Sequence, residues 1–328
     1  MKPAVIAGLA VLLWSAAPAA AQPGPEADRA LRSLYEAYWD WHVAEMGLIE
    51  KAGGSVEQGA TIPSATPEAQ RARAARTVEF RNQLARIDEA SLSPAEKVNA
   101  AVFRAALTET IEDARFAEWE MPFDSDSNFW SYWEAPAGYQ TVKEYEDYIA
   151  RMRALPRHFA EQTANARAGL ARGFSVPAVT MAGRDASLAA YIVDAPEKSP
   201  FWRAFAEMPA RFAEADRARL LADARAAIAG EVVPAYAAVL RFLREEYLPN
   251  ARKSLAAEAM PDGRAYYAQQ LRQYATLDVS PESIHRTGLA EVARIEREMR
   301  GIMAEVGFSG TVAEFNQKLR SDPQFTAR

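Results

Sequence analysis

Short polar sequences that start helices recur along this chain. Ser93, Thr141 and Thr311 are each followed by a glutamate three residues later. In such a capping box the hydroxyl and the carboxylate each bind a backbone N–H group at the start of the helix. Thr66-Pro67 and Ser280-Pro281 combine a polar cap with a proline at the first helical position. These marked starts constrain the fold more than any other feature of the sequence.

The segments that follow these starts carry apolar residues at three- and four-residue steps, the period of an amphipathic helix. Sustained alternation of the strand type and repeats of fixed period are both missing from the sequence. Pro156 and Pro234 lie inside two of the longest patterns, where proline bends a helix. The sequence therefore predicts an all-α fold, a multi-helix array with long, proline-kinked helices.

Several local features can be placed on these helices. Gly173 and Gly307 are expected to end two of them, with Phe308 folding back as the apolar contact of a Schellman cap. Residues 53–67, rich in Gly, Ser and Pro, are expected to form a connector. In the helix that starts at Ser93, we expect the side that carries Val98, Val102, Ala105 and Ile111 to face the core.

The first 21 residues have the layout of a secretory signal peptide. Lys2 is followed by an apolar run from Val5 to Trp14 and by alanines that end at Ala21. The alternative, a membrane anchor, needs a run of roughly 20 apolar residues, longer than this one. No later segment is expected to span a bilayer. The sequence therefore predicts an exported protein, periplasmic or secreted, that contacts no membrane after cleavage.

Composition narrows the chemistry available to the remaining residues, 22–328. The chain has no cysteine, which excludes disulfides, thiolate zinc ligands, a cysteine nucleophile and the lipid-bearing cysteine of a bacterial lipoprotein. Its net charge of −6 is spread along the chain and argues against nucleic acid as a partner. The sequence gives no indication of the oligomeric state.

Two partial motifs resemble metal sites. Glu282 and His285 have the spacing of half a carboxylate-bridged di-iron site, but no second Glu-x-x-His occurs. Asp124, Asp126 and Asn128 imitate the start of a calcium loop that lacks its glycine and its final glutamate. A first-turn polar pair and a solvated turn are the simpler interpretations. We therefore predict no catalytic residue, no metal ligand and no cofactor in this chain.

Residues 121–140 form a long irregular loop that is dense in aromatic side chains. Such rings can pin a loop to the helices, which is the interpretation their residue types favour, or they can line a pocket for a peptide or a sugar. Two tyrosines of the helix at 263–277 extend the pocket hypothesis. The candidate substrate-binding residues are Trp130, Tyr132, Trp133, Tyr266 and Tyr274.

The region from about Leu92 to Phe325 resembles a bacterial family known as domain of unknown function 885. The segments that carry the likeness include EYEDYIARMRALPRHFAEQTANARAGLARGFSVPAVTM, EVVPAYAAVLRFLREEYLPNAR, YYAQQLRQYATLDVSPESIHRTGLAEVARIEREM and IMAEVGFSGTVAEFNQKLRSDPQF. The resemblance implies a mostly helical fold similar to zinc metallopeptidases. It also implies a zinc site built from a His-Glu-Ala-x-Pro-Gly-His-His segment and a later Glu-Gly-Trp-Ala-Leu-Tyr-Ala-Glu segment, with peptides as substrates.

Neither of these two segments occurs in the chain, which ends at Arg328. Residues 22–328 are therefore expected to be the helical N-terminal part of a truncated family member, inactive by itself, with zinc and peptide substrate expected only in the full-length form. A shortened paralogue that has lost catalysis is the competing explanation. Another functional hypothesis is a non-catalytic periplasmic module that binds a peptide or a partner. If half of a fold is missing, an apolar helix face should be exposed.

Overall fold

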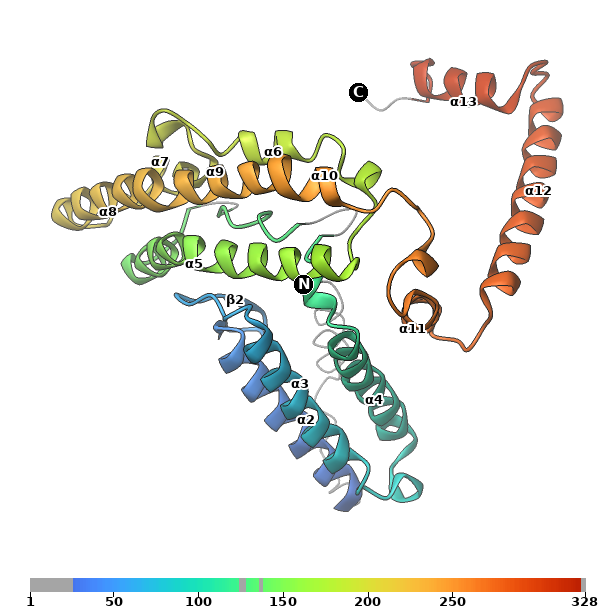
Figure 1. The fold of residues 1–328 in the computed structure, drawn as a ribbon, viewed down its shortest axis with the longest axis horizontal. Helices are drawn as coiled ribbons and strands as arrows, with labels where there is room; N and C mark the ends of the chain where they lie inside the picture. The colour runs from blue at the N-terminus through green and yellow to red at the C-terminus, as the bar shows by residue number, and fades with distance from the viewer. Residues whose placement is uncertain (1–25, 124–127, 136–137, 326–328) are drawn as a thin grey trace. The chain divides into compact units, whose positions relative to one another are not determined.

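The structure is a computed structural model that describes residues 26–123, 128–135 and 138–325. Most of these residues are helical, and the strands of the described part form one short hairpin (Figure 1). The all-α prediction is confirmed. The chain divides into two compact units, the first ending at Gly263 and the second beginning at Arg264. The predicted signal peptide, residues 1–21, lies outside the described residues.

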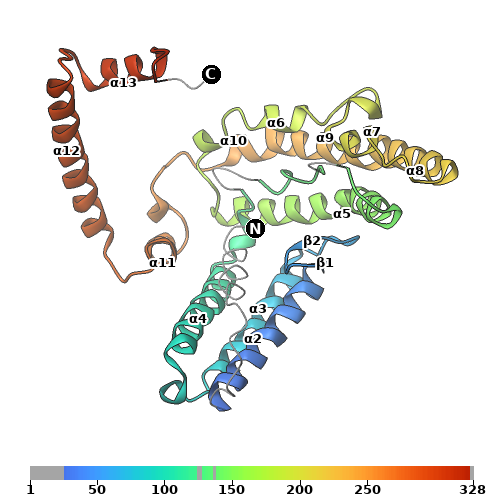
Figure 2. The same ribbon diagram turned by 180° about the vertical axis from the view of Figure 1, so that it is seen from behind.

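The first unit begins with three helices, α2 (Glu26–Glu45), α3 (Pro67–Leu84) and α4 (Pro94–Arg115). They lie side by side in both ribbon views (Figures 1 and 2). Apolar side chains from all three, and from the turn before α4, meet in one small core, because each helix alone has a face that must be covered. The core consists of Leu31, Leu34, Phe80, Leu84, Leu92, Ala100, Phe103 and Leu107.

The polar residues before α3 and α4 cap these helices. The Thr66 hydroxyl accepts a hydrogen bond from the Ala69 N–H at 3.3 Å, and the Ser93 hydroxyl accepts one from the Glu96 N–H at 3.4 Å. The reciprocal half of the capping box predicted at Ser93 does not form. The Glu96 carboxylate is buried and pairs instead with Arg32 of α2, at 2.6 Å. An ion pair between two helices replaces the local bond.

α4 turns a different face to the core from the one expected. Val98 and Val102 are 62% and 39% exposed, whereas Phe103 and Leu107 are buried. The expectation that the Val98 side would face the core is therefore wrong. Alanines occur on several sides of this helix, so its apolar face is poorly defined by the sequence. Phe103 and Leu107 are larger than the two valines, and burying them removes more apolar surface from water.

The connector after α2 contains a hairpin that the sequence did not indicate. Strands β1 (Leu48–Glu50) and β2 (Val56–Gln58) pair antiparallel, with Ile49 opposite Glu57 (Figure 2). The hairpin is short and mixed in polarity, so its residues show no clear alternation. Lys51 in its turn pairs with Glu144 at 2.6 Å, which ties the hairpin to the start of helix α5 (Val142–Arg172).

Helix α5 (Val142–Arg172) is the longest uninterrupted α-helix in the described part of the first unit. Its predicted capping box forms in full between Thr141 and Glu144, and its predicted end at Gly173 has a φ of 79°, in the left-handed region that favours glycine. The helix continues through Pro156 without a break.

Polar side chains on α5 bond to the backbone of residues 58–65. The Arg151 guanidinium donates to the carbonyl oxygens of Gln58 and Gly59, both at 2.6 Å. Further along, the Asn165 amide donates to the Ala65 carbonyl oxygen at 2.7 Å. The connector is thereby fixed along the helix. The side chains that make these bonds are Arg151, Arg157, Glu161 and Asn165.

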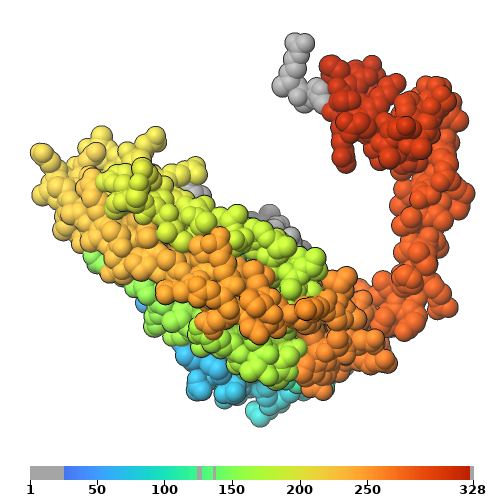
Figure 3. Space-filling view, turned by 45° about the horizontal axis from the view of Figure 1, so that its top comes forward, coloured from blue at the N-terminus to red at the C-terminus, as the bar shows by residue number. Residues whose placement is uncertain are grey.

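A continuous helical stretch from Glu214 to Asn250 packs against α5. Green segments of the α5 region and orange segments of the α9–α10 region meet in the space-filling view (Figure 3). Two π-helical turns interrupt the stretch, and one of them directly precedes Pro234, where the bend was expected. Its segments are α8 (Glu214–Ala227), η6 (Ile228–Val232), α9 (Val233–Phe242), η7 (Leu243–Tyr247) and α10 (Leu248–Asn250).

This stretch is long and apolar enough to cross a membrane by length and composition, contrary to the expectation that no segment after the signal peptide would be. Half of its most apolar window is buried within the structure. Ile228, Val232, Tyr236 and Leu243 are fully buried in the large core of the first unit. Its apolar character is therefore accounted for by core packing.

Short elements complete the first unit and connect the longer helices. They are η1 (Glu89–Ser91), η2 (Glu118–Glu120), η3 (Ala178–Met181), α6 (Asp185–Ala189), η4 (Pro196–Lys198), η5 (Pro200–Trp202), α7 (Arg203–Ala206) and η8 (Ala257–Ala259). Aromatic side chains of this region, such as Phe201 and Phe205, enter the same core as α5 and α9.

The second unit contains α11 (Gly263–Ala275), α12 (Pro281–Glu305) and α13 (Val312–Ser321). Figure 1 shows α12 as a single helix that α11 and α13 join at its two ends. The predicted cap after α12 forms: Gly307 has a φ of 68°, and the Phe308 N–H donates to the Met303 carbonyl oxygen at 2.8 Å. The Phe308 ring packs on Phe315 of α13, with the ring centroids 5.2 Å apart.

Candidate functional site

Trp130, the first candidate substrate-binding residue, is a core side chain. It is fully buried, and its indole N–H donates to the Ser187 hydroxyl at 3.1 Å. The Tyr236 hydroxyl donates to the Trp130 backbone carbonyl oxygen at 2.7 Å. Phe129 meets the indole edge to face, with the ring centroids 5.1 Å apart. These contacts pin the loop to α6 and α9 and leave the Trp130 ring no exposed face.

Trp133 is half-buried and is anchored in a similar way. Its indole N–H donates to the Phe129 carbonyl oxygen at 2.7 Å, and its ring lies edge-on to His158, with the centroids 5.1 Å apart. Burial lowers the pKa of His158 to about 4, so the imidazole is neutral near pH 7. The His158 Nδ1 atom is buried without a hydrogen-bond partner. Trp133 therefore covers a buried, neutral histidine.

Tyr132, between the two tryptophans, is 74% exposed. Its φ of 67° is in the left-handed region, which costs a tyrosine of the order of 1 kcal/mol and is seen more often at functional sites than elsewhere. The turn is closed by a hydrogen bond of 2.9 Å from the Ser131 N–H to the Asn128 carbonyl oxygen. Of the three loop candidates, Tyr132 is the one whose ring is available to a ligand.

The other two candidates, Tyr266 and Tyr274, lie on α11 in the second unit. Tyr266 is 7% exposed and Tyr274 is 69% exposed. The candidate set is thus divided between the two units. Among its five members, Tyr132 and Tyr274 present most of their surface to solvent.

The three histidines lie on three different helices, His42 on α2, His158 on α5 and His285 on α12. Within the described ranges, no three side chains of the His, Cys, Asp or Glu type gather as a metal site would require. Hydrogen bonds in the first turn of α12, from its own backbone N–H and from Ser280, lower the pKa of Glu282. Glu282 therefore acts as a helix-start residue.

The residues that imitate a calcium loop are only partly described. Asp124 and Asp126 lie outside the described residues. Asn128 is 9% exposed, and its side-chain oxygen is buried without a hydrogen-bond partner.

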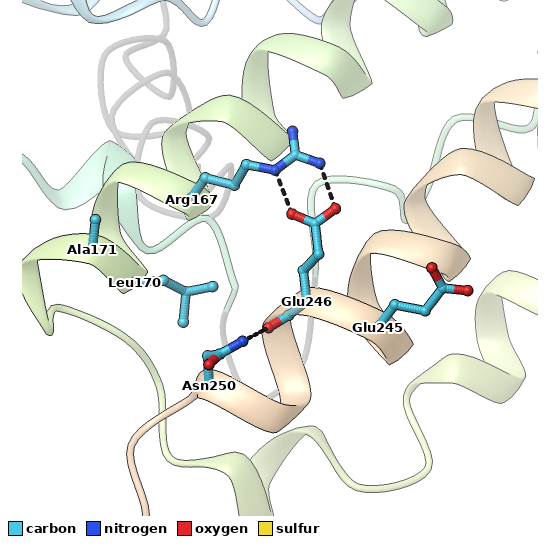
Figure 4. Close-up of a pocket in the computed structure, with 6 residues that line it drawn as sticks. All are labelled: Arg167, Leu170, Ala171, Glu245, Glu246 and Asn250. Carbon is cyan, nitrogen blue, oxygen red and sulfur yellow. Dashed lines mark hydrogen bonds and ion pairs between the residues drawn. The ribbon is translucent and has the colours of Figure 1, made fainter.

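A shallow hollow of about 330 Å³ lies between the end of α5 and the second π-helical turn of the Glu214–Asn250 stretch (Figure 4). Arg167 and Glu246 face each other in it and form a bidentate pair, with Nε–Oε2 and Nη2–Oε1 distances of 2.6 and 2.7 Å. The Asn250 amide donates to the Glu246 carbonyl oxygen at 2.7 Å. The remaining lining residues are Leu170, Ala171 and Glu245.

The charges of Arg167 and Glu246 in this hollow neutralise each other. Arg167 lowers the pKa of Glu246, and Glu246 raises that of Arg167, so each stabilises the ionised form of the other. The Glu245 carboxylate points away from the pair (Figure 4). A ligand would have to break the ion pair to use either charge, and neither group is poised to accept or release a proton near pH 7. The sequence could not reveal this pair, because its members are 79 residues apart.

Comparison with known proteins places the chain among helical relatives. Residues 45–328 match the family described as "Bacterial protein of unknown function (DUF885)", starting earlier than the region from about Leu92 noted in the sequence. The crystal structure described as "the putative lipoprotein from Colwellia psychrerythraea" is similar, with a TM-score of 0.76 and 24% sequence identity. No curated protein matches the chain.

The similarity to the Colwellia protein covers 92% of this chain and 55% of that one. This chain therefore spans about half the length of that protein. At 24% identity the likeness establishes the fold alone.

Proposed function

Because the chain belongs to the DUF885 family of bacterial proteins of unknown function, we propose that it forms the helical N-terminal part of a larger, peptidase-like protein. The observation that carries this proposal is the uneven coverage of the structural match: nearly all of this chain corresponds to only 55% of the Colwellia chain. In such a protein these helices provide scaffold and surface for a site whose reactive groups come from elsewhere.

The residues in hand do not fit the zinc site that the family resemblance implies. A catalytic zinc needs three converging protein ligands. His158 is buried beneath Trp133 and hydrogen-bonds the Pro63 carbonyl oxygen, and His285 is exposed in the first turns of α12. We therefore assign no step of zinc chemistry to this chain.

Export is part of the same proposal. Residues 1–21 have the layout of a signal peptide, and the Colwellia relative is described as a "putative lipoprotein", which supports an exported location. Detection of a mature chain that begins at Gln22 in a periplasmic or culture-medium fraction would test it. A cytoplasmic chain that still carries Met1–Ala21 would contradict it.

Peptide hydrolysis tests the functional proposal. The purified chain, incubated with fluorogenic peptides with and without added zinc, is expected to give no turnover above a heat-denatured control. Tight, stoichiometric zinc binding accompanied by hydrolysis would contradict the proposal. Reading the gene past the codon for Arg328 gives an independent test, since an in-frame His-Glu-Ala-x-Pro-Gly-His-His segment is expected.

The alternative function, a non-catalytic module that binds a peptide or a partner, is favoured by one observation. The Tyr132 ring is held outward in a left-handed conformation between two anchored tryptophans. If it binds peptides, a tryptic digest of casein should change the tryptophan fluorescence saturably, and Tyr132→Ala should weaken the effect. Tyr274→Ala then reports whether the second unit contributes. No saturable change with the parent chain would exclude casein peptides as ligands.

A further inference from the structure

Helix α12 carries an apolar stripe that the other helices of the second unit leave uncovered. Six apolar residues at helical spacing are between 37% and 62% exposed, and only Met303 is buried on this helix. A stripe of this kind on an amphipathic helix normally faces a core. It extends over roughly 33 Å, at about 1.5 Å per residue. The stripe consists of Ile284, Leu289, Val292, Ile295, Ile302 and the C-cap residue Val306.

One edge of the stripe is acidic. Glu291, Glu298 and Glu305 follow one another at seven-residue intervals, so they lie in one column beside the apolar residues. Arg294 pairs with Glu291 and Glu298 from the opposite side of the column, at 2.7 and 2.8 Å. On the other edge Glu296 pairs with Arg300 at 2.9 Å. The groups that border the apolar face are therefore carboxylates, with the arginines set further back.

These edges decide between possible occupants. Two copies of α12 packed through their stripes would bring carboxylates together, since Glu291 of one meets Glu296 of the other in a parallel pair and the Glu298 columns meet in an antiparallel pair. An anionic lipid surface would be repelled in the same way. A helix with an apolar face bordered by Lys or Arg satisfies both the stripe and its edges.

We propose that the α12 stripe is the docking surface for an amphipathic helix with basic edges, supplied by the part of the larger fold that this chain does not cover. The proposal rests on the proposed function for the source of the helix. The chemistry of the surface follows from α12 alone. The matched Colwellia chain has 45% of its length outside the similarity (100% − 55%), which provides room for such a helix.

Synthetic peptides test the surface chemistry. Two helical peptides of about 25 residues, long enough to cover the stripe, share one leucine face and carry either lysine or glutamate at its edges. Fluorescence anisotropy with the whole 328-residue chain is expected to show binding of the lysine-edged peptide and at least about tenfold weaker binding of the glutamate-edged one. Glu291→Lys combined with Glu298→Lys should reverse this preference.

Two variants separate docking from misfolding. Val292→Lys, in the middle of the stripe, should abolish binding, whereas Ala290→Lys, on the opposite side of the helix, should preserve it; circular dichroism checks that both variants fold. Equal affinity for both peptides, or binding of neither, would overturn the proposal. Binding of these two synthetic helices bears only on the α12 surface, and peptide hydrolysis bears only on the proposed function, so the two failures are distinguishable.

Two further measurements detect other occupants. A dimer in sedimentation velocity that Val292→Lys dissociates would show that a second copy covers the stripe. Because the chain has no cysteine, Ile295→Cys introduces a single thiol. Rapid reaction of this thiol with a maleimide is expected. Protection that ends when the chain unfolds would show that another segment of the same chain already covers the stripe, and would overturn the proposal.

Discussion

Helices α5 and α12 have similar amphipathic patterns and similar caps, but α5 is largely buried and α12 is largely exposed. Both are long and amphipathic, and both begin at a hydroxyl cap with a glutamate in the first turn. α5 buries residues along almost its whole length, including Tyr145, Tyr148 and Phe159, whereas α12 buries Met303 alone. An amphipathic pattern therefore indicates that a face needs covering, and it does not say what covers it.

The difference comes from partners that are distant in sequence. The apolar side of α5 packs on the Glu214–Asn250 stretch, and its polar side bonds to residues 58–65. The ion pairs of α12 join side chains three or four residues apart on the same helix, such as Arg294 with Glu291. Solvent screens surface pairs of this kind, so α12 gains little stability from them.

The largest difference is expected from removing one apolar side chain in each region. Trp130→Ala removes a fully buried indole and should lower the free energy of unfolding by about 3–5 kcal/mol, because it leaves a cavity and removes the hydrogen bond from the indole to the Ser187 hydroxyl. Val292→Ala on α12 should change it by less than about 0.5 kcal/mol. Urea denaturation followed by circular dichroism measures both. A large loss with Val292→Ala would mean that the stripe is already covered.

Acid should destabilise the first unit through His158. Its pKa is lowered to about 4 in the folded chain, so between pH 6.5 and 4 the unfolded chain binds a proton that the folded chain does not. Stability is therefore fully present above pH 6.5 and falls as the pH is lowered through this window. Between pH 6.5 and 5 the loss should be about 2 kcal/mol, at 1.36 kcal/mol per pH unit.

Substituting histidines tests that assignment. His158→Phe should remove most of the loss between pH 6.5 and 5, measured as the change in urea midpoint. His285→Phe on exposed α12 is the matched control and should retain the slope of the parent chain. If the slope survives in His158→Phe, another group carries the pH dependence.

What the sequence could predict is local. The caps at Thr141 and Thr311 and the turn at Gly307 and Phe308 depend on residues within one helical turn, and the structure has them as expected. The loop aromatics illustrate the limit. Their types favoured packing, but the partner of the Trp130 indole, Ser187, is 57 residues away and could not be identified in advance.

What the sequence could not predict depends on distant partners. Glu96 left its local capping role for Arg32, which is 64 residues away, and the β1–β2 hairpin is fixed by Lys51 on Glu144, 93 residues away. The wrong face expected for α4 has the same origin, since the positions of α2 and α3 decide whether Val98 or Phe103 is buried. The candidate site residues were chosen by residue type alone, and the structure distributes them over both units.

The smallest effects come from two capping boxes that have the same local geometry in different surroundings. Thr141→Ala at the start of α5 should lower the free energy of unfolding of the first unit by about 1 kcal/mol, because the Glu144 N–H loses its acceptor. Thr311→Ala removes the same bond from the 10-residue helix α13. A helix this short is marginal without tertiary support, so the change should raise amide exchange locally, across residues 312–321. The main urea transition should not move. A shift as large as that of Thr141→Ala would show that α13 unfolds together with the first unit, and the contrast between the two regions would then lie in exposure alone.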